Sequence, residues 1–312
     1  MCNLKQKKFI ITGGAGFIGS NLVRKLLNQK AKVIVIDDLS SGFEKNLPNS
    51  PDLNIIKKQV QKVKLDKFCE IDGLFHLAAQ ASVPLSIKKF SSSSNNNLLS
   101  SLNVLDFCSK YKIPLVYASS SAVYGNMSYG NDMNKSVQIV HPYAADKFML
   151  EEYAKMCNLA FNLSSCGLRF FNVYGPYQDP KNPYSGVISI FANRLLNKMP
   201  LEINGGFQKR DFIFIKDVVD AIIASYVYIK NKKVSKVFNV MSSISTSIDE
   251  LADIMSKYMN VDLKKIYKPL MKNDPIKSSG NSNKIFKELN FKPETNLKDG
   301  LKITIDWIKN EE

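Results

Sequence analysis

Residues 12–19 read Thr-Gly-Gly-Ala-Gly-Phe-Ile-Gly, a glycine-rich turn between a short apolar run and a stretch whose apolar residues recur at helical spacing. The pattern predicts a buried strand, a turn and a helix. Gly13 allows the tight turn, Gly16 lets the backbone approach a pyrophosphate, and Gly19 lets the helix pack close to the sheet. Because the first N–H groups of a helix are free, its start also attracts a phosphate.

A β-branched run at 33–36 follows and predicts a second strand, buried on both faces of a parallel sheet. Asp37 closes this strand, where an acid accepts hydrogen bonds from the adenosine ribose of a dinucleotide. A carboxylate there repels a 2′-phosphate, so the segment predicts a Rossmann-type NAD site rather than an NADP site. Asp38 is equally well explained as a residue that caps the turn.

Strands and helices continue to alternate, which predicts an α/β fold with a doubly wound parallel sheet. Further strands are expected near 54–56, 73–77, 115–118, 162–169, 211–215 and 237–240, and further helices near 96–110, 143–157, 218–229, 248–258 and 297–309. The polar stretch 91–97 is expected to be a loop. We expect an NAD-binding Rossmann domain over 1–171 and a smaller, partly interleaved α/β domain over 172–312, with 211–241 packing back on the first.

Composition excludes several classes of protein. The net charge is +15, but only four of the 43 basic residues are arginine and the lysines are spread along the chain, so no nucleic-acid role is expected. No apolar run could span a bilayer, and two histidines give little support for a metal. Five cysteines without CxxC spacing, and no visible signal peptide, favour reduced thiols in the cytoplasm.

Tyr143 and Lys147 stand one helical turn apart in the segment Tyr-Ala-Ala-Asp-Lys. A free tyrosine has a pKa of about 10 and is a poor base at neutral pH. A lysine cation favours the phenolate, so we expect Lys147 to lower the pKa of Tyr143. The serines at 119–121 follow an apolar strand, at the sheet edge where ligands of open α/β sheets bind. One of them is expected to share a substrate hydroxyl with Tyr143.

Six motifs define a resemblance: TGGAGFIG (12–19), HLAA (76–79), ASSSAVYG (118–125), YAADK (143–147), RFFNVYGP (169–176) and RDFIFIKDV (210–218). On these the sequence resembles the extended short-chain dehydrogenase/reductases, in particular the nucleotide-sugar epimerases of the UDP-glucose 4-epimerase type. The resemblance covers essentially the whole chain. It implies NAD as the cofactor, a UDP-sugar as the substrate and a homodimer formed through the helices near 96–110 and 143–157.

The resemblance implies Ser120, Tyr143 and Lys147 as catalytic residues, with Ser119 and Ser121 still open as the active hydroxyl. His76 is expected to be a buried histidine at a strand end. The implied NAD-binding residues are Gly13, Gly16, Phe17, Ile18, Asp37, Asp38, Ser40, Gln59, Val60, Leu77, Ala78, Ala79, Asn97, Tyr143, Lys147 and Phe170. The implied substrate-binding residues are Val83, Ser86, Ser120, Ser121, Tyr143, Asn172, Val187, Arg210, Lys277 and Ser278.

Three positions depart from the family pattern. Gln59 stands where an acid usually meets the adenine amine, and Lys277 takes the place of a second phosphate-binding arginine, so tight diphosphate binding there is in doubt. Ala122 stands where the related dehydratases and decarboxylases keep an acid. A site without that acid can move a hydride and a hydroxyl proton, which indicates 4-epimerisation.

The resemblance also bears on the substrate. Family members with a bulky residue at the position of Ser278 or Ser279 exclude an acetamido group. The small residues here favour UDP-N-acetylglucosamine and its galacto epimer, with UDP-glucose as a possible second substrate. The alternatives are a UDP-uronate 4-epimerase, a nucleotide-sugar 4-ketoreductase and, more remotely, a non-catalytic NAD-binding module.

Overall fold

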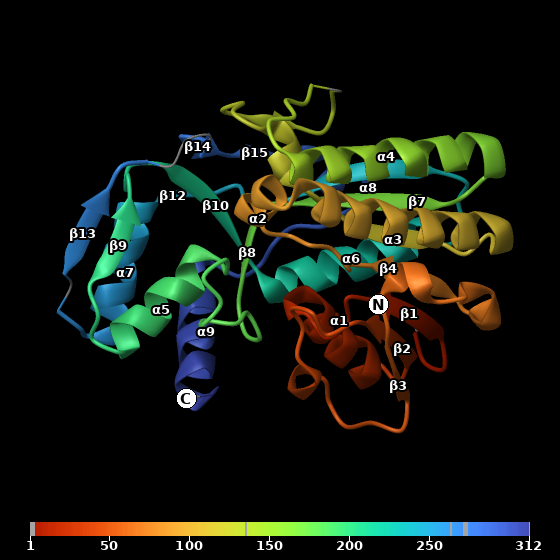
Figure 1. The fold of residues 1–312 in the computed structure, drawn as a ribbon, viewed down its shortest axis with the longest axis horizontal. Helices are drawn as coiled ribbons and strands as arrows, with labels where there is room; N and C mark the ends of the chain where they lie inside the picture. The colour runs from red at the N-terminus through yellow and green to blue at the C-terminus, as the bar shows by residue number, and fades with distance from the viewer. Residues whose placement is uncertain (1–3, 135, 263, 271–273, 312) are drawn as a thin grey trace. The chain divides into compact units, whose positions relative to one another are not determined.

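The computed structural model describes residues 4–134, 136–262, 264–270 and 274–311. The chain forms two compact units, each made of three separate segments (Figure 1). Unit 1 comprises the chain up to Val123, His141–Arg169 and Val219–Phe238, and unit 2 comprises Tyr124–Val140, Phe170–Val218 and the chain from Asn239 onward.

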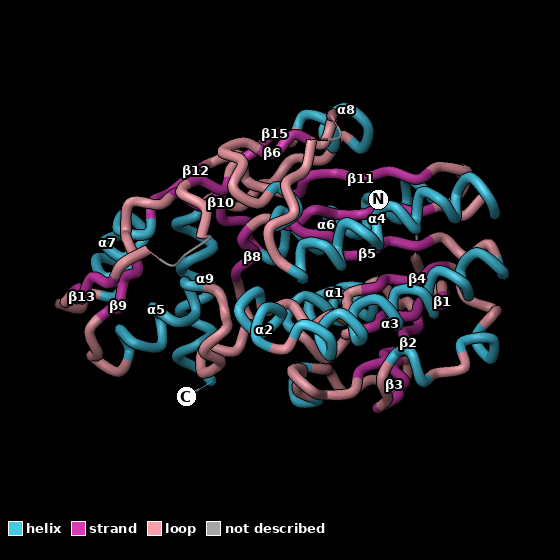
Figure 2. Tube along the Cα trace, turned by 45° about the horizontal axis from the view of Figure 1, so that its top comes forward, coloured by secondary structure: helices cyan, strands magenta, loops and turns pink. Residues whose placement is uncertain are grey.

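A seven-stranded sheet forms the centre of unit 1, with the strand order β11-β7-β5-β4-β1-β2-β3. Figure 2 shows β5, β4, β1, β2 and β3 following one another in this order. Its strands are β1 (Lys8–Thr12), β2 (Lys32–Asp37), β3 (Leu53–Lys57), β4 (Gly73–His76), β5 (Leu115–Ser120), β7 (Ser165–Phe170) and β11 (Ser235–Val240). The strands β3, β2, β1, β4 and β5 pair in parallel. Because the chain moves outward from β1 to β3 and then returns to pair β4 on the other side of β1, a topological switch point lies between β1 and β4. Ligands of such sheets bind at the carboxyl ends of these strands.

Helices cover both faces of this sheet. They are α1 (Phe17–Asn28), α2 (Val83–Lys88), α3 (Phe90–Tyr111), α4 (Pro142–Phe161) and α6 (Ile215–Ile229). On one face, α3 and α4 lie side by side and close the core that contains Leu74 and Tyr117 (Figure 1). On the other face, the ring of Tyr226 in α6 contacts Phe9 and Phe75 at centroid distances of 5.1 and 5.8 Å. The predicted doubly wound sheet is confirmed.

The predicted loop at 91–97 is wrong, because α3 already begins at Phe90. Serine and asparagine are poor helix formers when isolated, but here tertiary hydrogen bonds hold them. Ser93 Oγ donates to the Gln80 side chain at 2.9 Å, and Asn97 binds the backbone of Gln80. A smaller error concerns Asn162, which was expected in a strand but ends α4 in the left-handed conformation, with φ of 58°.

In its described residues, unit 2 is built from short strands and four further helices. Its strands are β6 (Gly130–Asn131), β8 (Asn172–Tyr174), β9 (Leu201–Asn204), β10 (Lys209–Phe214), β12 (Ser245–Ser247), β13 (Lys265–Lys268), β14 (Lys277–Ser278) and β15 (Gly280–Asn281). Its helices are α5 (Val187–Leu196), α7 (Ile248–Met259), α8 (Asn283–Leu289) and α9 (Leu297–Glu311), and α5 packs on both α7 and α9. The strand β10 has β8, β12 and β14 as neighbours. In the described part of the chain, no helix is long and apolar enough to cross a membrane.

Candidate active site

The glycine turn lies between β1 and α1 at the switch point of the sheet. Gly13 has φ of +71°, and a Cβ built on it would lie 2.6 Å from the backbone nitrogen of Ala78. A Cβ on Gly19 would lie 2.1 Å from the carbonyl oxygen of Gly13. Side chains are therefore excluded where the turn meets the loop after β4 and where α1 meets the turn.

The start of α1 is open to a ligand. Among the residues that the structure describes, a Cβ on Gly16, which precedes α1, would meet only the Gly13 carbonyl, at 3.3 Å, and no side chain caps this end of the helix. Phe17 and Ile18 form the first turn of α1 and are half-buried. The free backbone donors and the positive end of the helix dipole suit the pyrophosphate of a dinucleotide.

Asp37 ends β2 and is buried beside the glycine turn. Its Oδ2 accepts from the Ala15 N–H and its Oδ1 from the Leu39 N–H, both at 2.9 Å. Burial raises the pKa of Asp37, and the two backbone donors oppose that shift. Each carboxylate oxygen keeps a lone pair that could accept from a ribose hydroxyl. Asp38 is exposed and caps a turn, accepting from the Ser40 N–H at 3.0 Å.

Two predicted NAD-binding residues follow β3, and one of them, Gln59, is expected to meet the adenine. Gln59 is half-buried and precedes a single 3-10 turn, and Val60 is buried at the start of that turn. The carbonyl of Val60 accepts from the Asn103 amide of α3 at 2.8 Å. The loop that carries Gln59 and Val60 is therefore anchored to α3 through a backbone carbonyl.

The loop after β4 contains Leu77, Ala78 and Ala79, all half-buried. The N–H of Leu77 donates to the carbonyl of Thr12 at 3.0 Å, and the N–H of Ala78 donates to the Thr12 hydroxyl at 3.3 Å. This loop is therefore held against the glycine turn, at the edge of the sheet where the turn lies.

His76 is buried at the end of β4, as expected. Its Nδ1 lies 2.7 Å from the Thr12 hydroxyl and its Nε2 lies 3.1 Å from the Ser101 hydroxyl of α3. Burial, together with the nearby charge of Lys147, lowers the pKa of His76 to about 3. The imidazole is therefore neutral at physiological pH and connects β1, β4 and α3.

This histidine should make the protein sensitive to acid. In the unfolded chain His76 takes up a proton near pH 6.5, but the folded chain resists protonation down to about pH 3. Stability is therefore fully present above about pH 6.5 and falls as the pH drops toward 3, by at most about 5 kcal/mol for this group. Urea unfolding of the wild type and of His76→Gln at a series of pH values checks this. We expect the variant to have the shallower dependence, and equal slopes would contradict the assignment.

The three serines after β5 have different surroundings. Ser119 is buried, and its hydroxyl donates to Glu151 Oε1 at 2.5 Å. Ser120 is half-buried, accepts from the Ala122 N–H at 3.1 Å and forms a side-chain hydrogen bond with Tyr143. Ser121 is half-buried in the single turn that follows. Among the three, the geometry favours Ser120 as the hydroxyl that works with Tyr143.

Tyr143 lies in the first turn of α4. The ring of His141 caps this helix by accepting from the Ala144 N–H at 3.1 Å, and Pro142 occupies the first helical position. The N–H of Tyr143 donates to the Ser86 hydroxyl at 3.3 Å, and that hydroxyl donates to the carbonyl of Val83 at 2.8 Å. The predicted substrate residues of α2 therefore support the backbone of Tyr143.

The expected direction of the Tyr143 pKa is wrong. Desolvation raises the pKa of Tyr143 to about 12, the hydrogen bond with Ser120 lowers it in part, and the charge of Asp146 raises it further. Lys147 does not offset this burial, because its Nζ lies 5.8 Å from the ring centroid and donates to the carbonyl of Ala118 at 2.7 Å. The phenol of the protein alone is therefore protonated.

Lys147 is itself a perturbed group. It is buried one helical turn after Tyr143, and desolvation lowers its pKa to about 8, against the charges of Asp146 and Glu151, which raise it. The amine is held at the end of β5 by the Ala118 carbonyl. A cation that is poorly solvated and has two neighbouring carboxylates responds strongly to any further charge that enters the site.

A buried ion pair below this site was not anticipated from the sequence. Arg169 of β7 binds Glu151 of α4 through two nitrogens, with Nε–Oε1 at 2.9 Å and Nη2–Oε2 at 2.6 Å. Ser119 completes the cluster. The signal was present, because Glu151 follows Lys147 by one further helical turn and Arg169 is one of four arginines. The pair connects β5, α4 and β7, and two of these elements carry the predicted catalytic residues.

In unit 2, the predicted phosphate-binding residues lie along β8 and β10. Asn172 begins β8, and its amide donates to the carbonyl of Asp211 at 2.9 Å. Arg210 is buried in β10 and pairs with Asp274, with Nη2 2.5 Å from Oδ1. Val187 is half-buried at the start of α5, and Phe170 is buried at the end of β7. In this unit, Arg210 is therefore fixed by an acid that the sequence did not single out.

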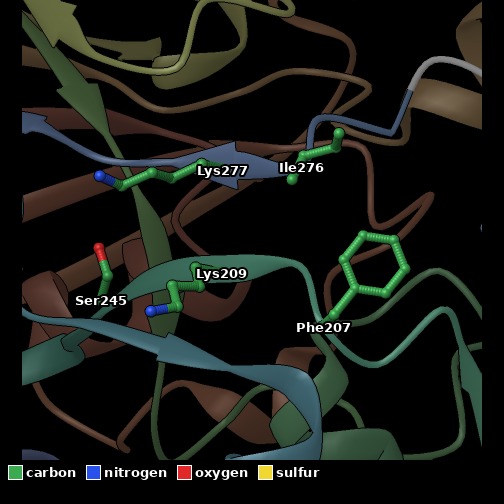
Figure 3. A pocket seen from close by; sticks show the side chains of 5 residues that line it. All are labelled: Phe207, Lys209, Ser245, Ile276 and Lys277. Atoms are coloured by element: carbon green, nitrogen blue, oxygen red, sulfur yellow. The ribbon is translucent and has the colours of Figure 1, made fainter.

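Lys277 and Arg210 lie on opposite faces of paired strands. In the parallel register of β10 and β14, Lys277 is opposite Lys209 and Ser278 is opposite Arg210. Lys277 and Lys209 line one pocket together with Phe207, Ser245 and Ile276 (Figure 3), and its volume is about 360 Å³. Ser278 is half-buried on the Arg210 face. The structure therefore does not bring Lys277 to the side chain of Arg210, whereas Ser278 is its direct neighbour.

The residues at the switch point fit NAD. A glycine turn that would reject side chains at Gly13 and Gly19 leads into an uncapped helix start, and the carboxylate of Asp37 lies beside it. These are a pyrophosphate site and a ribose acceptor. Bound there, NAD would supply a hydride acceptor in the same unit as Ser120 and Tyr143.

Comparison with known proteins agrees with this arrangement. Residues 9–240 match the model of the NAD dependent epimerase/dehydratase family, and the chain belongs to that family. Membership in an NAD-dependent family confirms the expected cofactor.

Several of its relatives are described as epimerases of UDP-sugars. A putative UDP-glucose 4-epimerase of Methanocaldococcus jannaschii is 34% identical, over 96% of this chain and 98% of the relative. The structure of a UDP-N-acetylglucosamine 4-epimerase from Methanobrevibacter ruminantium superposes with a TM-score of 0.93 at 34% identity, covering 99% and 100% of the two chains. A UDP-glucuronic acid 4-epimerase from Bacillus cereus, solved with its sugar nucleotide and NAD, gives a TM-score of 0.89 at 27% identity, over 98% and 100%.

Proposed function

We propose that this chain is a UDP-sugar 4-epimerase that interconverts UDP-N-acetylglucosamine and UDP-N-acetylgalactosamine, and accepts UDP-glucose as a second substrate. The observation that carries the proposal is the group formed by Ser120, Tyr143 and Lys147 in unit 1. Ser120 ends β5, and the glycine turn follows β1 at the same carboxyl edge of one sheet. Its family membership and its UDP-sugar relatives support the same reaction.

In this proposal, Tyr143 is the general base for the sugar 4-hydroxyl. Ser120 hydrogen-bonds the phenol and can share the hydroxyl of the substrate, so it relays the proton over a short path. NAD bound at the glycine turn would supply the hydride acceptor for the same carbon, and a 4-keto sugar that regains the hydride on its other face would leave no cofactor consumed. Lys147 Nζ lies 5.8 Å from the Tyr143 ring centroid. Its charge does not offset the burial that raises the pKa of Tyr143 in the protein alone, but in this proposal it stabilises the phenolate once the proton has left.

Ala122 stands where dehydratases and decarboxylases of the resembled family keep an acid. Ala122 is half-buried in the turn after β5, and its N–H donates to Ser120. A methyl side chain there cannot remove a proton beside the transient ketone. This supports simple epimerisation over dehydration or decarboxylation.

Product analysis tests the function directly. The purified protein is incubated separately with UDP-N-acetylglucosamine, UDP-glucose and UDP-glucuronic acid, each deuterated at C4, and the products are resolved by chromatography and mass spectrometry. We expect the C4 epimer of the first two, with the label retained because the hydride returns to the carbon it left. Conversion of the glucuronate alone would support the uronate epimerase that the Bacillus cereus neighbour suggests. Conversion of none would contradict the proposal.

Substrate choice should depend on Ser278. It is a small, half-buried residue, paired in register with Arg210. We expect Ser278→Tyr to lower kcat/KM for UDP-N-acetylglucosamine by roughly 10- to 100-fold and to leave UDP-glucose within a few-fold, because the added ring excludes the acetamido group. Ser279→Ala is the control, since the Ser279 hydroxyl is buried and donates to the carbonyl of Ser128 at 3.0 Å. Equal losses for both sugars would show that the residue does not sense the acetamido group.

A homodimer is part of the proposal, and the exposed apolar surface of α3 and α4 supports it. Seven large apolar side chains of these helices are 39–78% exposed: Phe90, Leu99, Leu102, Met149, Met156, Leu159 and Phe161. The two helices lie side by side (Figure 1). Apolar surface gathered on adjacent helices marks an interaction site in most soluble proteins.

The oligomeric state can be measured by light scattering after gel filtration. We expect a dimer for the wild type, and at least a tenfold weaker dimer for Met156→Lys/Leu159→Lys, because a charge must then be buried. The double variant Ile303→Lys/Phe286→Lys also replaces exposed apolar residues, but outside these helices, and should stay dimeric. A wild-type monomer would contradict this part of the proposal.

We place the enzyme in the cytoplasm, because Cys69, Cys108, Cys157 and Cys166 are all free thiols.

A further inference from the structure

Asn97 of α3 makes an unusually complete set of hydrogen bonds for a residue expected to bind NAD. It is buried, its Oδ1 accepts from the Gln80 N–H at 2.8 Å, and its Nδ2 donates to Asp146 Oδ2 at 2.9 Å and to the Gln80 carbonyl at 3.3 Å. Its own carbonyl accepts from the Ser101 hydroxyl at 2.7 Å. The side-chain amide is therefore committed to protein partners.

These bonds fix which way the amide points. The Gln80 N–H can only donate, so the oxygen of Asn97 must face it and the nitrogen must face Asp146. Asp146 must then present an acceptor, which a carboxylate does. Asp146 is buried on α4, between Tyr143 and Lys147 in the sequence.

The same bonds lead back to the glycine turn. Gln80 continues the loop whose Ala78 N–H binds the Thr12 hydroxyl, and Ala78 is the residue that a side chain on Gly13 would strike. A second route runs from Thr12 through His76 and Ser101 to the carbonyl of Asn97. The two routes form a closed ring, and Asp146 is its connection to α4.

The charged groups around the catalytic pair are few. Asp146 and Glu151 lie on α4 itself, and His76 faces Lys147 from β4 but is neutral at physiological pH. Asp146 acts on both members of the pair, since its charge raises the pKa of Tyr143 and that of Lys147. Replacing Asp146 should therefore change the surroundings of the Tyr143 phenol as well as the loop that carries Gln80.

We propose that Asp146 is a positioning residue: through Asn97 it ties the catalytic helix to the loop that packs on the glycine turn, so that NAD affinity and the surroundings of Tyr143, three residues earlier on the same helix, depend on one side chain. The inference rests on the proposed function for the catalytic role of Tyr143. The hydrogen bond and the charge of Asp146 are separable, because Asn in its place keeps an acceptor for Asn97 and loses the charge.

Two measurements that need no turnover test this. The first is calorimetric titration of each folded variant with NAD. We expect Asp146→Ala to bind NAD roughly 2- to 10-fold more weakly, as for a lost hydrogen bond, and Asp146→Asn to bind like the wild type. Asp146→Ser replaces the alanine variant if that fails to fold. The control is Ser93→Ala, which removes the bond to the side chain of the same Gln80 and should leave the affinity unchanged.

The second measurement is the ultraviolet difference titration of the Tyr143 phenolate, obtained by subtracting the curve of the matching Tyr143→Phe protein. We expect its midpoint to move to lower pH in Asp146→Asn and to stay fixed in Ser93→Ala. Wild-type NAD affinity in the folded alanine or serine variant would overturn the tie to the loop, and an unmoved midpoint in Asp146→Asn would overturn the tie to Tyr143. NAD affinity and the phenolate titration can both be measured in a protein that converts no UDP-sugar. A failure of the proposed epimerase activity is therefore distinguishable from a failure of the proposed role of Asp146.

Discussion

Replacing Tyr143 by phenylalanine is expected to lower kcat for the epimerisation by roughly 10²- to 10⁴-fold, the usual contribution of a positioned general base. The ring stays, so packing should change little. Only the phenolic oxygen that Ser120 contacts is lost, so NAD affinity should fall far less than kcat. Steady-state kinetics with the preferred UDP-sugar, together with an NAD titration, measure both effects.

The result also separates an enzyme from a module that only binds NAD. Phe148→Tyr adds a phenol to α4 at a half-buried position, and serves as a control for a disturbed helix. Because Ser120 hydrogen-bonds the phenol, Ser120→Ala should lower kcat in the same direction but by less. Equal turnover by wild type and Tyr143→Phe would mean that the base lies elsewhere.

The second large effect is expected in stability. Glu151→Gln removes the charge that faces Arg169, in a pair whose side chains are only 4% and 6% exposed. A buried guanidinium left without its carboxylate costs about 3–5 kcal/mol of unfolding free energy. Denaturant unfolding measures this loss. The matched control is Glu44→Gln, whose partner Lys57 is in an exposed pair at 2.7 Å and should hardly matter.

A double variant shows whether the stability lost in Glu151→Gln comes from the missing ion pair itself or from leaving one buried charge without its partner. Glu151→Leu/Arg169→Leu removes both charges together, and we expect it to recover much of the stability that the single change loses. Stability unchanged by Glu151→Gln would mean that Arg169 finds another partner. Because Ser119 also binds Glu151, the crystal structure of the double variant would show whether the end of β5 keeps its course.

The sequence predicted the fold well where a pattern depends on neighbours along the chain. The glycine turn, the alternating strands and helices and the position of Tyr143 in the first turn of α4 all follow from local spacing. The helix at 91–97 did not, because its serines and asparagines are stabilised by Gln80 from another segment. Local propensity carries no information on such tertiary partners.

The candidate site shows the same division. Motifs identified Ser120 and Lys147, but the pKa of Tyr143 moved opposite to expectation, since burial is a property of the folded chain. Asp274 was missed as the partner of Arg210, because nothing in their spacing shows that they meet. Lys277 was grouped with Arg210 on sequence grounds, and the alternation of faces in β14 separates their side chains.

The interleaving of the two units has a consequence for synthesis. The sheet of unit 1 receives β7 only after Phe170 has been made, and its outermost strand β11 only after Val240. Until then a growing chain on the ribosome carries β5 with an uncovered strand edge, which readily pairs with other chains. Chains truncated before Val240 should therefore aggregate rather than form a free cofactor-binding fragment. Chains that end after β11 contain all the strands of that sheet.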